Sequence, residues 1–286
     1  MSELQYDTPA QIAATTVETA EKKAKLDWRR QLVLAILAGA FIAFASEGSN
    51  MAAFNLLANP DTYGLGKVLA GAVFGTGLMF VILAGGELFT GNMLMVAGVM
   101  SKRVRVRSML RNWLVVYVGN LLGSLLIAFF MVHSGLFDSG DGLLGGVTIK
   151  IAAHKTGLPF HSALILGVMC NWIVCLSVWM AYGAKDMAGK VLVIFFGIML
   201  FITSGFEHSI ANMYYIPAGI LAKGNVDWVS ASHLSQVALD GLNWQTFLWN
   251  NLLPVTVGNI LGGAVFVGAA YWFVYLREKK QDAKNV

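Results

Sequence analysis

The sequence has few charged residues for its length. Asp, Glu, Lys and Arg make up 13% of the 286 residues, whereas 57% are hydrophobic, and the mean hydropathy is +0.64. A water-soluble globular fold of this composition would lack the polar residues needed to cover its surface. A hydrocarbon core of about 30 Å takes about 20 helical residues per crossing, and the chain offers several uncharged stretches of that order. The composition therefore indicates one membrane domain with the lipid bilayer as its solvent.

Cysteine is also scarce, since the chain has only Cys170 and Cys175, five positions apart in one apolar stretch. This placement suggests neither a disulfide framework nor a metal clip, so we expect both to be packing residues. No His-x-x-x-His or Glu-x-x-His pair lies near the intramembrane acids described below. We therefore expect no metal and no cofactor, and an intramembrane enzyme is only a remote alternative.

The first 30 residues lack the apolar core of a signal peptide, so we expect the first span to act as the insertion signal. Pro9 followed by residues 11–25 predicts a short, charged, amphipathic surface helix. We divide the chain into an N-terminal segment (1–30), a six-helix membrane domain (31–276) and a basic tail (277–286). The net charge of +4 and pI near 9.0 do not indicate a nucleic-acid partner, because the basic residues cluster beside apolar segments.

Acidic residues interrupt the apolar part of the chain and define its spans. The uncharged runs are residues 31–46, 68–86, 88–101, 112–137, 158–184, 191–206, 209–222 and 241–276. The two runs beside Glu87 and the two beside Glu207 each form one span that is interrupted near its middle. Six spans remain, of which the second and fifth are broken. The first span continues past Glu47, which we expect to interrupt it nearer its outer end.

The distribution of positive charge orients these spans. An even number of spans places both termini on one side, together with the loops after spans two and four. That side carries 16 of the 20 Lys and Arg residues, and the other carries only Lys67, Lys150, Lys155 and Lys223. Cytoplasmic loops carry the excess of Lys and Arg. The count therefore supports a multi-pass membrane protein with both termini in the cytoplasm.

The two halves of the chain resemble each other. Residues 111–123 read RNWLVVYVGNLLG at the start of span three, and residues 250–262 read NNLLPVTVGNILG at the start of span six. With three spans in each half, the second copy enters the membrane from the opposite side. Such inverted repeats place a binding site at the interface of their broken helices. The expected fold is an all-α inverted repeat of three plus three spans.

Both breaks combine glycine, an acid and small hydroxyl residues: residues 84–92 read AGGELFTGN, and residues 203–212 read TSGFEHSIAN. Non-helical backbone at membrane depth must be buried in protein or line an aqueous path. The ends of half-helices expose backbone amides, which a carboxylate at the break can cap. We therefore expect Glu87 and Glu207, with Gly86 and Gly205, to be structural residues that hold the breaks in shape.

His208 is the expected functional residue of the second break. An intramembrane histidine titrates near neutrality and can exchange a proton with a weak acid. Thr90 in the matching loop is its expected hydrogen-bonding partner, although a threonine at a break is often a local backbone cap.

The motif GFEHSIANM at residues 205–213, together with residues 87–90 and 257–259, resembles the formate/nitrite transporter family over residues 10–278. The resemblance implies an aquaporin-like fold, a homopentamer with one pore per protomer, and passage of formate, nitrite, hydrosulfide or related monoacids. The roles that it implies are a central histidine for His208, a loop threonine for Thr90, an asparagine holding the histidine for Asn171 and an outer vestibule lysine for Lys155. It also implies apolar constrictions at Phe74 and Leu78 toward the cytoplasm and at Phe201 toward the outside.

These residues predict a transport mechanism. An anion entering an apolar constriction loses its hydration, which costs several kcal/mol or more. We expect Lys155 to concentrate the anion and protonated His208 to meet it between the constrictions, where proton transfer lets the neutral acid pass.

The substrate motifs point in two directions. Gly91 after the loop threonine resembles the nitrite-channel branch, whereas residues 154–155, 215–220 and 262–268 resemble formate channels. We expect formate, with nitrite or hydrosulfide as alternatives. The direction of transport, proton coupling and a gating role of residues 1–30 do not follow from the sequence.

Overall fold

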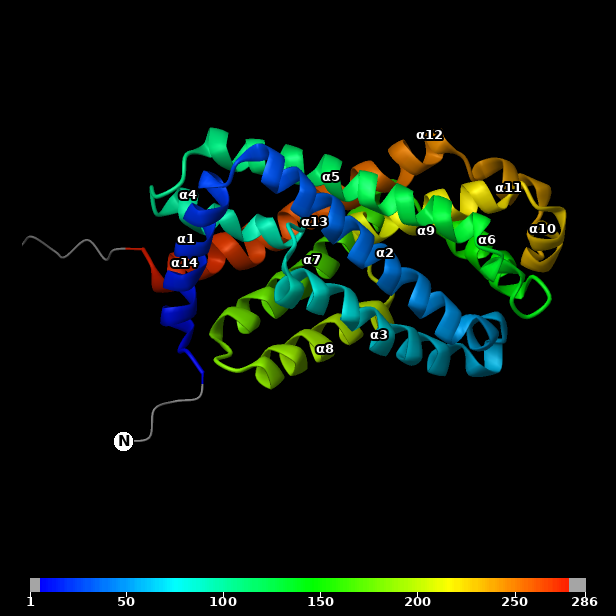
Figure 1. The fold of residues 1–286 in the computed structure, drawn as a ribbon, viewed down its shortest axis with the longest axis horizontal. Helices are drawn as coiled ribbons and strands as arrows, with labels where there is room; N and C mark the ends of the chain where they lie inside the picture. Colours follow the sequence, from blue (N-terminus) through cyan, green and yellow to red (C-terminus); the bar gives the residue numbers. More distant parts are fainter. Residues whose placement is uncertain (1–5, 278–286) are drawn as a thin grey trace, which may run out of the picture.

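Six helical segments of the computed structural model are long and apolar enough to cross a bilayer, which confirms the six predicted spans. They are Trp28–Ala58, Pro60–Gly85, Val106–His133, Phe160–Gly183, Met187–Ser204 and Trp244–Tyr275. The structure describes residues 6–277, so nearly all of the predicted tail 277–286 lies outside the described residues. The spans lie side by side along the long axis of the molecule, as expected for a multi-pass membrane protein (Figure 1).

The helices of the first half are α1 (Pro9–Lys25), α2 (Trp28–Ala58), α3 (Tyr63–Met79) with a π-helical continuation (Phe80–Gly85), a 3-10 turn (Gly91–Leu94), α4 (Met95–Met100) and α5 (Val106–His133). Those of the second half are α6 (Leu143–Thr156), α7 (Phe160–Gly183), α8 (Met187–Ser204), α9 (Ser209–Ala222), α10 (Val226–Ser232) and α11 (Gln236–Gly241). The sixth span combines α12 (Trp244–Thr246), α13 (Leu253–Ile260) and α14 (Ala270–Tyr275) with π-helical segments at Phe247–Leu252 and Leu261–Ala269. Short 3-10 turns also occupy Pro60–Thr62 and Leu136–Asp138.

The two halves repeat one order of elements. Each consists of a shorter helix (α1 or α6), an unbroken span (α2 or α7), a broken span (α3 and α4, or α8 and α9) and a last span. The sequence did not predict α6, because its 14 residues are too few to cross a bilayer and include Lys150, His154 and Lys155. We call the end of the bundle with α1, α4 and α14 the α1 end, and the end with α6, α10 and α11 the α6 end (Figure 1).

The repeated Val-Gly-Asn segments place glycine where spans cross most closely. A Cβ on Gly123 of α5 would lie 2.0 Å from the Ile36 carbonyl oxygen of α2. A Cβ on Gly262 would lie 2.2 Å from the Val168 carbonyl oxygen of α7. Without a side chain at these positions, the helix backbones come into direct contact, which is how membrane helices associate when small residues line the interface. The same crossing therefore occurs once in each half.

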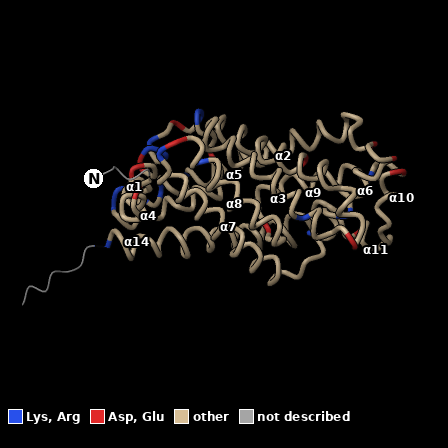
Figure 2. Tube along the Cα trace, turned by 90° about the horizontal axis from the view of Figure 1, so that it is seen from below, with Lys and Arg blue, Asp and Glu red and all other residues tan. Residues whose placement is uncertain are grey.

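The helix predicted near the N-terminus is present as α1 and does more than cover the surface. A capping box between Thr8 and Gln11 starts it. Its apolar face, which includes Ile12 and Val17, is buried in contact with α4 and α7. Lysines and arginines of the described chain gather around it at the α1 end (Figure 2).

Two expectations about the spans change. The first span is not interrupted at Glu47, since α2 runs without a break from Trp28 to Ala58 and the buried Glu47 carboxylate accepts a hydrogen bond from the Tyr214 hydroxyl of α9. At the breaks, Gly85 and Gly205 both have positive φ, of 100° and 78°. Gly86, the glycine expected to shape the first break, is in extended backbone with φ of −165°. Glycine adopts positive φ without the clash of a Cβ, so Gly85 is the counterpart of Gly205.

Candidate functional site at the two helix breaks

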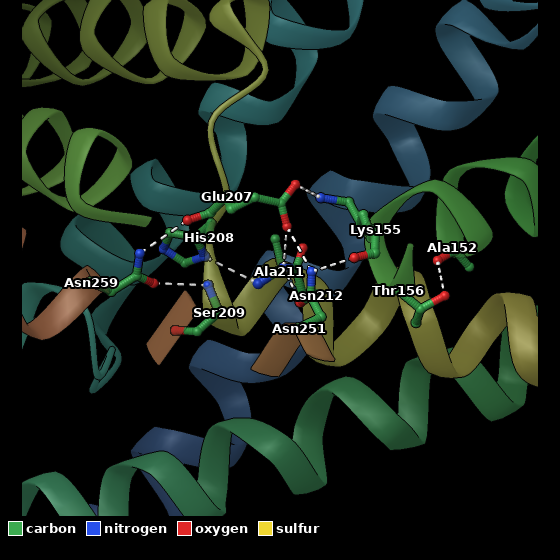
Figure 3. Close-up of polar contacts among 10 residues, drawn as sticks. All are labelled: Ala152, Lys155, Thr156, Glu207, His208, Ser209, Ala211, Asn212, Asn251 and Asn259. Carbon is green, nitrogen blue, oxygen red and sulfur yellow. Dashed lines mark hydrogen bonds and ion pairs between the residues drawn. The ribbon is translucent and has the colours of Figure 1, made fainter. Parts of the chain in front are cut away.

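The Glu207 carboxylate is held by three side chains from three helices (Figure 3). Its Oε1 lies 2.7 Å from Lys155 Nζ of α6, and the two side chains are only 5% and 13% exposed. Its Oε2 accepts hydrogen bonds from Asn212 Nδ2 at 2.6 Å and Asn251 Nδ2 at 3.1 Å. Every contact favours the ionised carboxylate, and the lysine compensates its charge. Glu207 is thus engaged in structure, and its carboxylate is not a free charge toward an anion.

The first break repeats this network in mirrored position. Lys23 Nζ of α1 lies 2.5 Å from Glu87 Oε1. Glu87 Oε2 accepts from Asn92 Nδ2 at 2.7 Å, and Asn112 Nδ2 lies 3.5 Å away. Lys23 therefore corresponds to Lys155. Lys23 lies in the last turn of the helix before the first span, and Lys155 lies in the last turn of the helix before the fourth.

One asparagine in each half fixes the backbone at the glutamate and two residues after it. Asn259 Oδ1 accepts from the Ser209 amide at 2.8 Å, and its Nδ2 donates to the Glu207 carbonyl at 3.0 Å (Figure 3). Asn120 does the same in the first half, accepting from the Phe89 amide at 2.9 Å and donating to the Glu87 carbonyl at 2.9 Å. Buried backbone groups released by a break need partners, and this side chain supplies two of them. This explains why the asparagine recurs in the repeated segment.

His208 and Thr90 meet at the centre, where the two broken spans face each other. His208 Nε2 lies 3.0 Å from Thr90 Oγ1, and both side chains are buried. The Ala211 amide donates to His208 Nδ1 at 3.1 Å. Because an N–H occupies Nδ1, the proton of the neutral ring is on Nε2, which donates to the threonine hydroxyl. The contact predicted between His208 and Thr90 is therefore present, with the imidazole as a hydrogen-bond donor.

The central pair lies where two helical segments begin. His208 is the N-cap of α9, and Thr90 directly precedes the 3-10 turn that leads into α4. Helix N-termini carry a partial positive charge and unsatisfied amides. Two such ends at membrane depth make the centre favourable for an anion, as in membrane proteins whose half-helices point at anionic substrates.

Asn171 does not make the contact expected of it. Its Nδ2 donates to the Thr90 carbonyl at 3.1 Å and to the Asn259 carbonyl at 2.7 Å, and no hydrogen bond joins it to His208 within residues 6–277. Cys175, one turn further along α7, also donates to the Thr90 carbonyl, with Sγ at 3.3 Å. Both side chains therefore hold the threonine loop, and Asn171 is linked to the histidine indirectly, through Thr90.

The three apolar residues expected to constrict the path are buried, but they do not form two separate rings. The Phe74 and Phe201 rings pack edge to face, 5.7 Å apart, and the Phe201 ring stacks 5.9 Å from the His208 ring. Leu78, one turn beyond Phe74, lines a cavity of about 320 Å³ at the α1 end. Lys23 and Glu87 also line this cavity. The two phenylalanines thus form one apolar cluster beside the histidine.

Comparison with known proteins places this architecture among membrane transporters. Residues 10–273 match the formate/nitrite transporter family. The chain is similar to a probable formate transporter of Methanothermobacter thermautotrophicus, with 38% identity over 96% of this chain and 98% of the relative. It is similar to the formate channel FocA of Escherichia coli strain K12, with 36% identity over 94% and 95% of the two chains.

Solved structures agree with the sequence comparison. A pentameric formate channel with formate bound superposes with a TM-score of 0.78 at 37% identity, covering 87% of this chain and 98% of that one. An FNT family ion channel superposes with a TM-score of 0.76 at 29% identity, covering 92% and 98%.

Proposed function

Because this chain belongs to the formate/nitrite transporter family, we propose that it conducts small monovalent anions of weak acids across the membrane, and that formate is its substrate. The formate channels with which it shares 36–37% identity support this substrate. The solved pentameric channel supports a homopentamer, for which we propose one pore in each protomer. The matched relatives are channels and transporters, and we assign this chain a transport function and no enzymatic one.

The observation that carries the proposal is the electrostatics of the centre. The glutamates of the two breaks, Glu87 and Glu207, are paired with lysines, at 2.5 Å and 2.7 Å, so neither presents an uncompensated negative charge. Between them, two helical N-termini and the Nε2–H of His208 face the same region. An anion that has lost water finds donors and partial positive charge there, which lowers the cost of its desolvation.

Beside this centre, the apolar Phe74–Phe201 cluster offers the anion few polar groups to replace its lost water. Transfer of a proton to the anion removes its charge and so reduces the desolvation cost. Proton uptake at Nδ1 converts His208 to an imidazolium, whose Nε2 proton passes to a carboxylate oxygen and leaves neutral acid and a ring protonated at Nδ1. In the resting geometry the Ala211 amide occupies Nδ1, so this step requires that hydrogen bond to open. Proton exchange is therefore coupled to a movement at the start of α9.

The α1 end is assigned to the cytoplasm of a bacterial cell and the α6 end to the outside. The support is the distribution of Lys and Arg along the whole sequence, with 16 of 20 on the side of both termini. In the described chain these residues gather at the α1 end (Figure 2). Lys155 then lies on the outer side and Lys23 on the inner side.

Flux in proteoliposomes tests the function. The purified protein is reconstituted, and uptake of formate, nitrite, hydrosulfide, chloride and glycerol is followed by stopped-flow recording at several pH values, with empty liposomes as control. We expect formate to enter fastest and glycerol no faster than into empty liposomes. Faster uptake of nitrite or hydrosulfide than of formate would assign one of these alternative substrates to the protein. Gly91 after the loop threonine is the sequence feature that favours them. Equal flux of glycerol would refute an anion channel.

A further inference from the structure

Lys67 is a second lysine at the outer break that the site described above does not use. It lies on α3, is half-buried, and is near the turn where α8 ends and the second break begins. A Cβ on Gly205 would lie 3.8 Å from Lys67 Nζ, and apart from the chain neighbours Ser204 and Phe206 no other residue has a heavy atom within 4 Å of that position. The ammonium therefore lies directly beside the glycine of the break.

The charge of Lys67 is not compensated by a direct partner. Within residues 6–277 its ammonium makes no hydrogen bond or ion pair, and only its carbonyl is engaged, by Thr203 Oγ1 at 3.5 Å. The charged groups that act on it are Lys155 and Glu207. Glu207 is already committed to Lys155 at 2.7 Å and to two asparagines. The charges of Lys67, Lys155 and Glu207 sum to one net positive charge, and Lys67 is the member of this group without a direct counter-ion.

The other lysines of the α6 end differ from Lys67 in this respect. Lys155 is paired with Glu207, and Lys223 Nζ donates to the Leu239 and Leu242 carbonyls, which lie around the end of α11. Lys150, also on α6, is exposed to solvent. A free anion interacts most strongly with the cation that has no internal counter-ion and is partly shielded from water.

Helical spacing aligns Lys67 with the apolar cluster. Residues 67, 71, 74 and 78 follow the i, i+4, i+7, i+11 pattern that forms one stripe along a helix. Along this stripe Gly71 faces Thr203, Phe74 contacts Phe201, and Leu78 lines the cavity at the α1 end. Lys67 is the outermost member. An anion at Lys67 is therefore at the start of the face of α3 that leads to His208.

We propose that Lys67 forms an anion-binding site at the outer mouth, where its ammonium holds a small monovalent carboxylate above Gly205 before the anion reaches the Phe74–Phe201 pair. This inference rests on the proposed function, and it moves the recruiting role expected of Lys155 to its neighbour. Lys155 instead compensates Glu207.

The inverted repeat supports a specific role for Lys67. The break glutamates Glu87 and Glu207 are 120 positions apart, and the same offset places Met187 opposite Lys67. The scaffold of the first break thus forms without a lysine at this position. A structural alternative exists, because the ammonium also lies at the C-terminal, partly negative end of α8. The test must therefore separate charge toward the anion from stabilisation of α8.

Initial rates of formate uptake into proteoliposomes are measured against formate concentration for the full-length protein and for Lys67→Gln, Lys67→Arg and Lys150→Gln. Lys150→Gln is the matched control, since it removes the same charge at the same end. We expect Lys67→Gln to raise the half-saturating formate concentration about tenfold, the change that corresponds to 1.4 kcal/mol. The half-saturating formate concentration of Lys67→Arg should stay within about twofold of that of the parent. The difference in this concentration between the parent and Lys67→Gln should become smaller at high ionic strength.

A second variant keeps the test independent of folding. Lys67→Cys is folded and reconstituted first, and its thiol is then modified with a thiosulfonate that adds either a trimethylammonium or a sulfonate group. The native Cys170 and Cys175 are buried. We expect the cationic adduct to restore the low half-saturating concentration and the anionic adduct to raise it further. Equal effects of both adducts, or a Lys150→Gln shift as large as that of Lys67→Gln, would overturn the inference. Absence of formate flux in the parent protein would instead refute the proposed function.

Discussion

Substitution of Asn259 tests whether the repeated asparagines hold the breaks. Asn259→Leu removes the side chain that accepts from Ser209 N–H at 2.8 Å and donates to the carbonyls of Glu207 at 3.0 Å and Gly167 at 2.8 Å. Gly167 lies inside α7, where its carbonyl keeps an intrahelical bond. The Ser209 amide and the Glu207 carbonyl are left without this partner in a region where Asn259 is completely buried.

Each buried backbone group left unsatisfied costs about 1–3 kcal/mol, so we expect Asn259→Leu to destabilise the protein by about 2–6 kcal/mol. Asn120→Leu removes the equivalent bonds of Phe89 and Glu87 and should cost a similar amount. The half-buried Asn225, which caps α10, is the matched control, and Asn225→Ala should cost about 1 kcal/mol.

The assay is unfolding of the purified protein by dodecyl sulfate in mixed micelles, followed by far-ultraviolet circular dichroism. The free energy of unfolding is compared among the parent, Asn120→Leu, Asn259→Leu and Asn225→Ala. If Asn259→Leu lowered the free energy of unfolding no more than Asn225→Ala does, Asn259 would not be holding the break. If the two leucine variants differed by more than about 2 kcal/mol, the two halves would not be energetically equivalent.

Three further predictions concern the second half. Gly205→Ala forces a Cβ into φ of 78° and should lower the unfolding free energy by about 1–2 kcal/mol; an unchanged value in the same unfolding assay would contradict the strained turn. Lys155→Met and Glu207→Gln each leave a buried partner unpaired, and each should lower the unfolding free energy by about 3–5 kcal/mol. The double variant should lose less than the sum of the two single variants. Strictly additive losses of unfolding free energy would argue against a direct pair. Cys170 and Cys175 should resist maleimide labelling in the folded protein and react after denaturation, and rapid labelling without denaturant would contradict their burial.

The spans were predictable because apolar runs and the positions of acids are local properties of the chain. Charge asymmetry and the repeated Val-Gly-Asn segments also fixed the inverted order. The continuation of α2 through Glu47 was missed because its partner, Tyr214, is distant in sequence. A buried carboxylate in a helix cannot be distinguished from an interruption until that partner is known.

The contacts inside the site were only partly predictable. The motif at residues 205–213 located His208, and the matching loop located Thr90. Lys23 was missed as a site residue because its ion pair with Glu87 joins residues 64 positions apart and depends on the packing of α1. The short helix α6 was missed for a related reason: α6 packs on α9 and acts as part of the repeat, although its own sequence is neither long nor apolar enough to predict a span.

The two apolar constrictions were predicted on opposite sides of His208, yet the Phe74 and Phe201 rings touch. Phe74 on α3 and Phe201 on α8 meet because these antiparallel helices pack through Gly71 and Gly75. Small residues on one helix decide which side chains can meet across the pair. The two glycines are visible in the sequence, but the sequence does not show which helix packs against them.

In the proposed mechanism, the anion passes the His208–Thr90 contact and exchanges a proton there. The most direct test of this mechanism is formate flux in proteoliposomes between pH 5 and 8, with the flux into empty liposomes subtracted, for the parent, His208→Phe and the exposed-surface control His161→Phe. Protonated histidine increases as pH falls, so flux of the parent and of His161→Phe should rise toward low pH, and flux of His208→Phe should lose this dependence. The same pH profile in His208→Phe as in the parent would contradict the account.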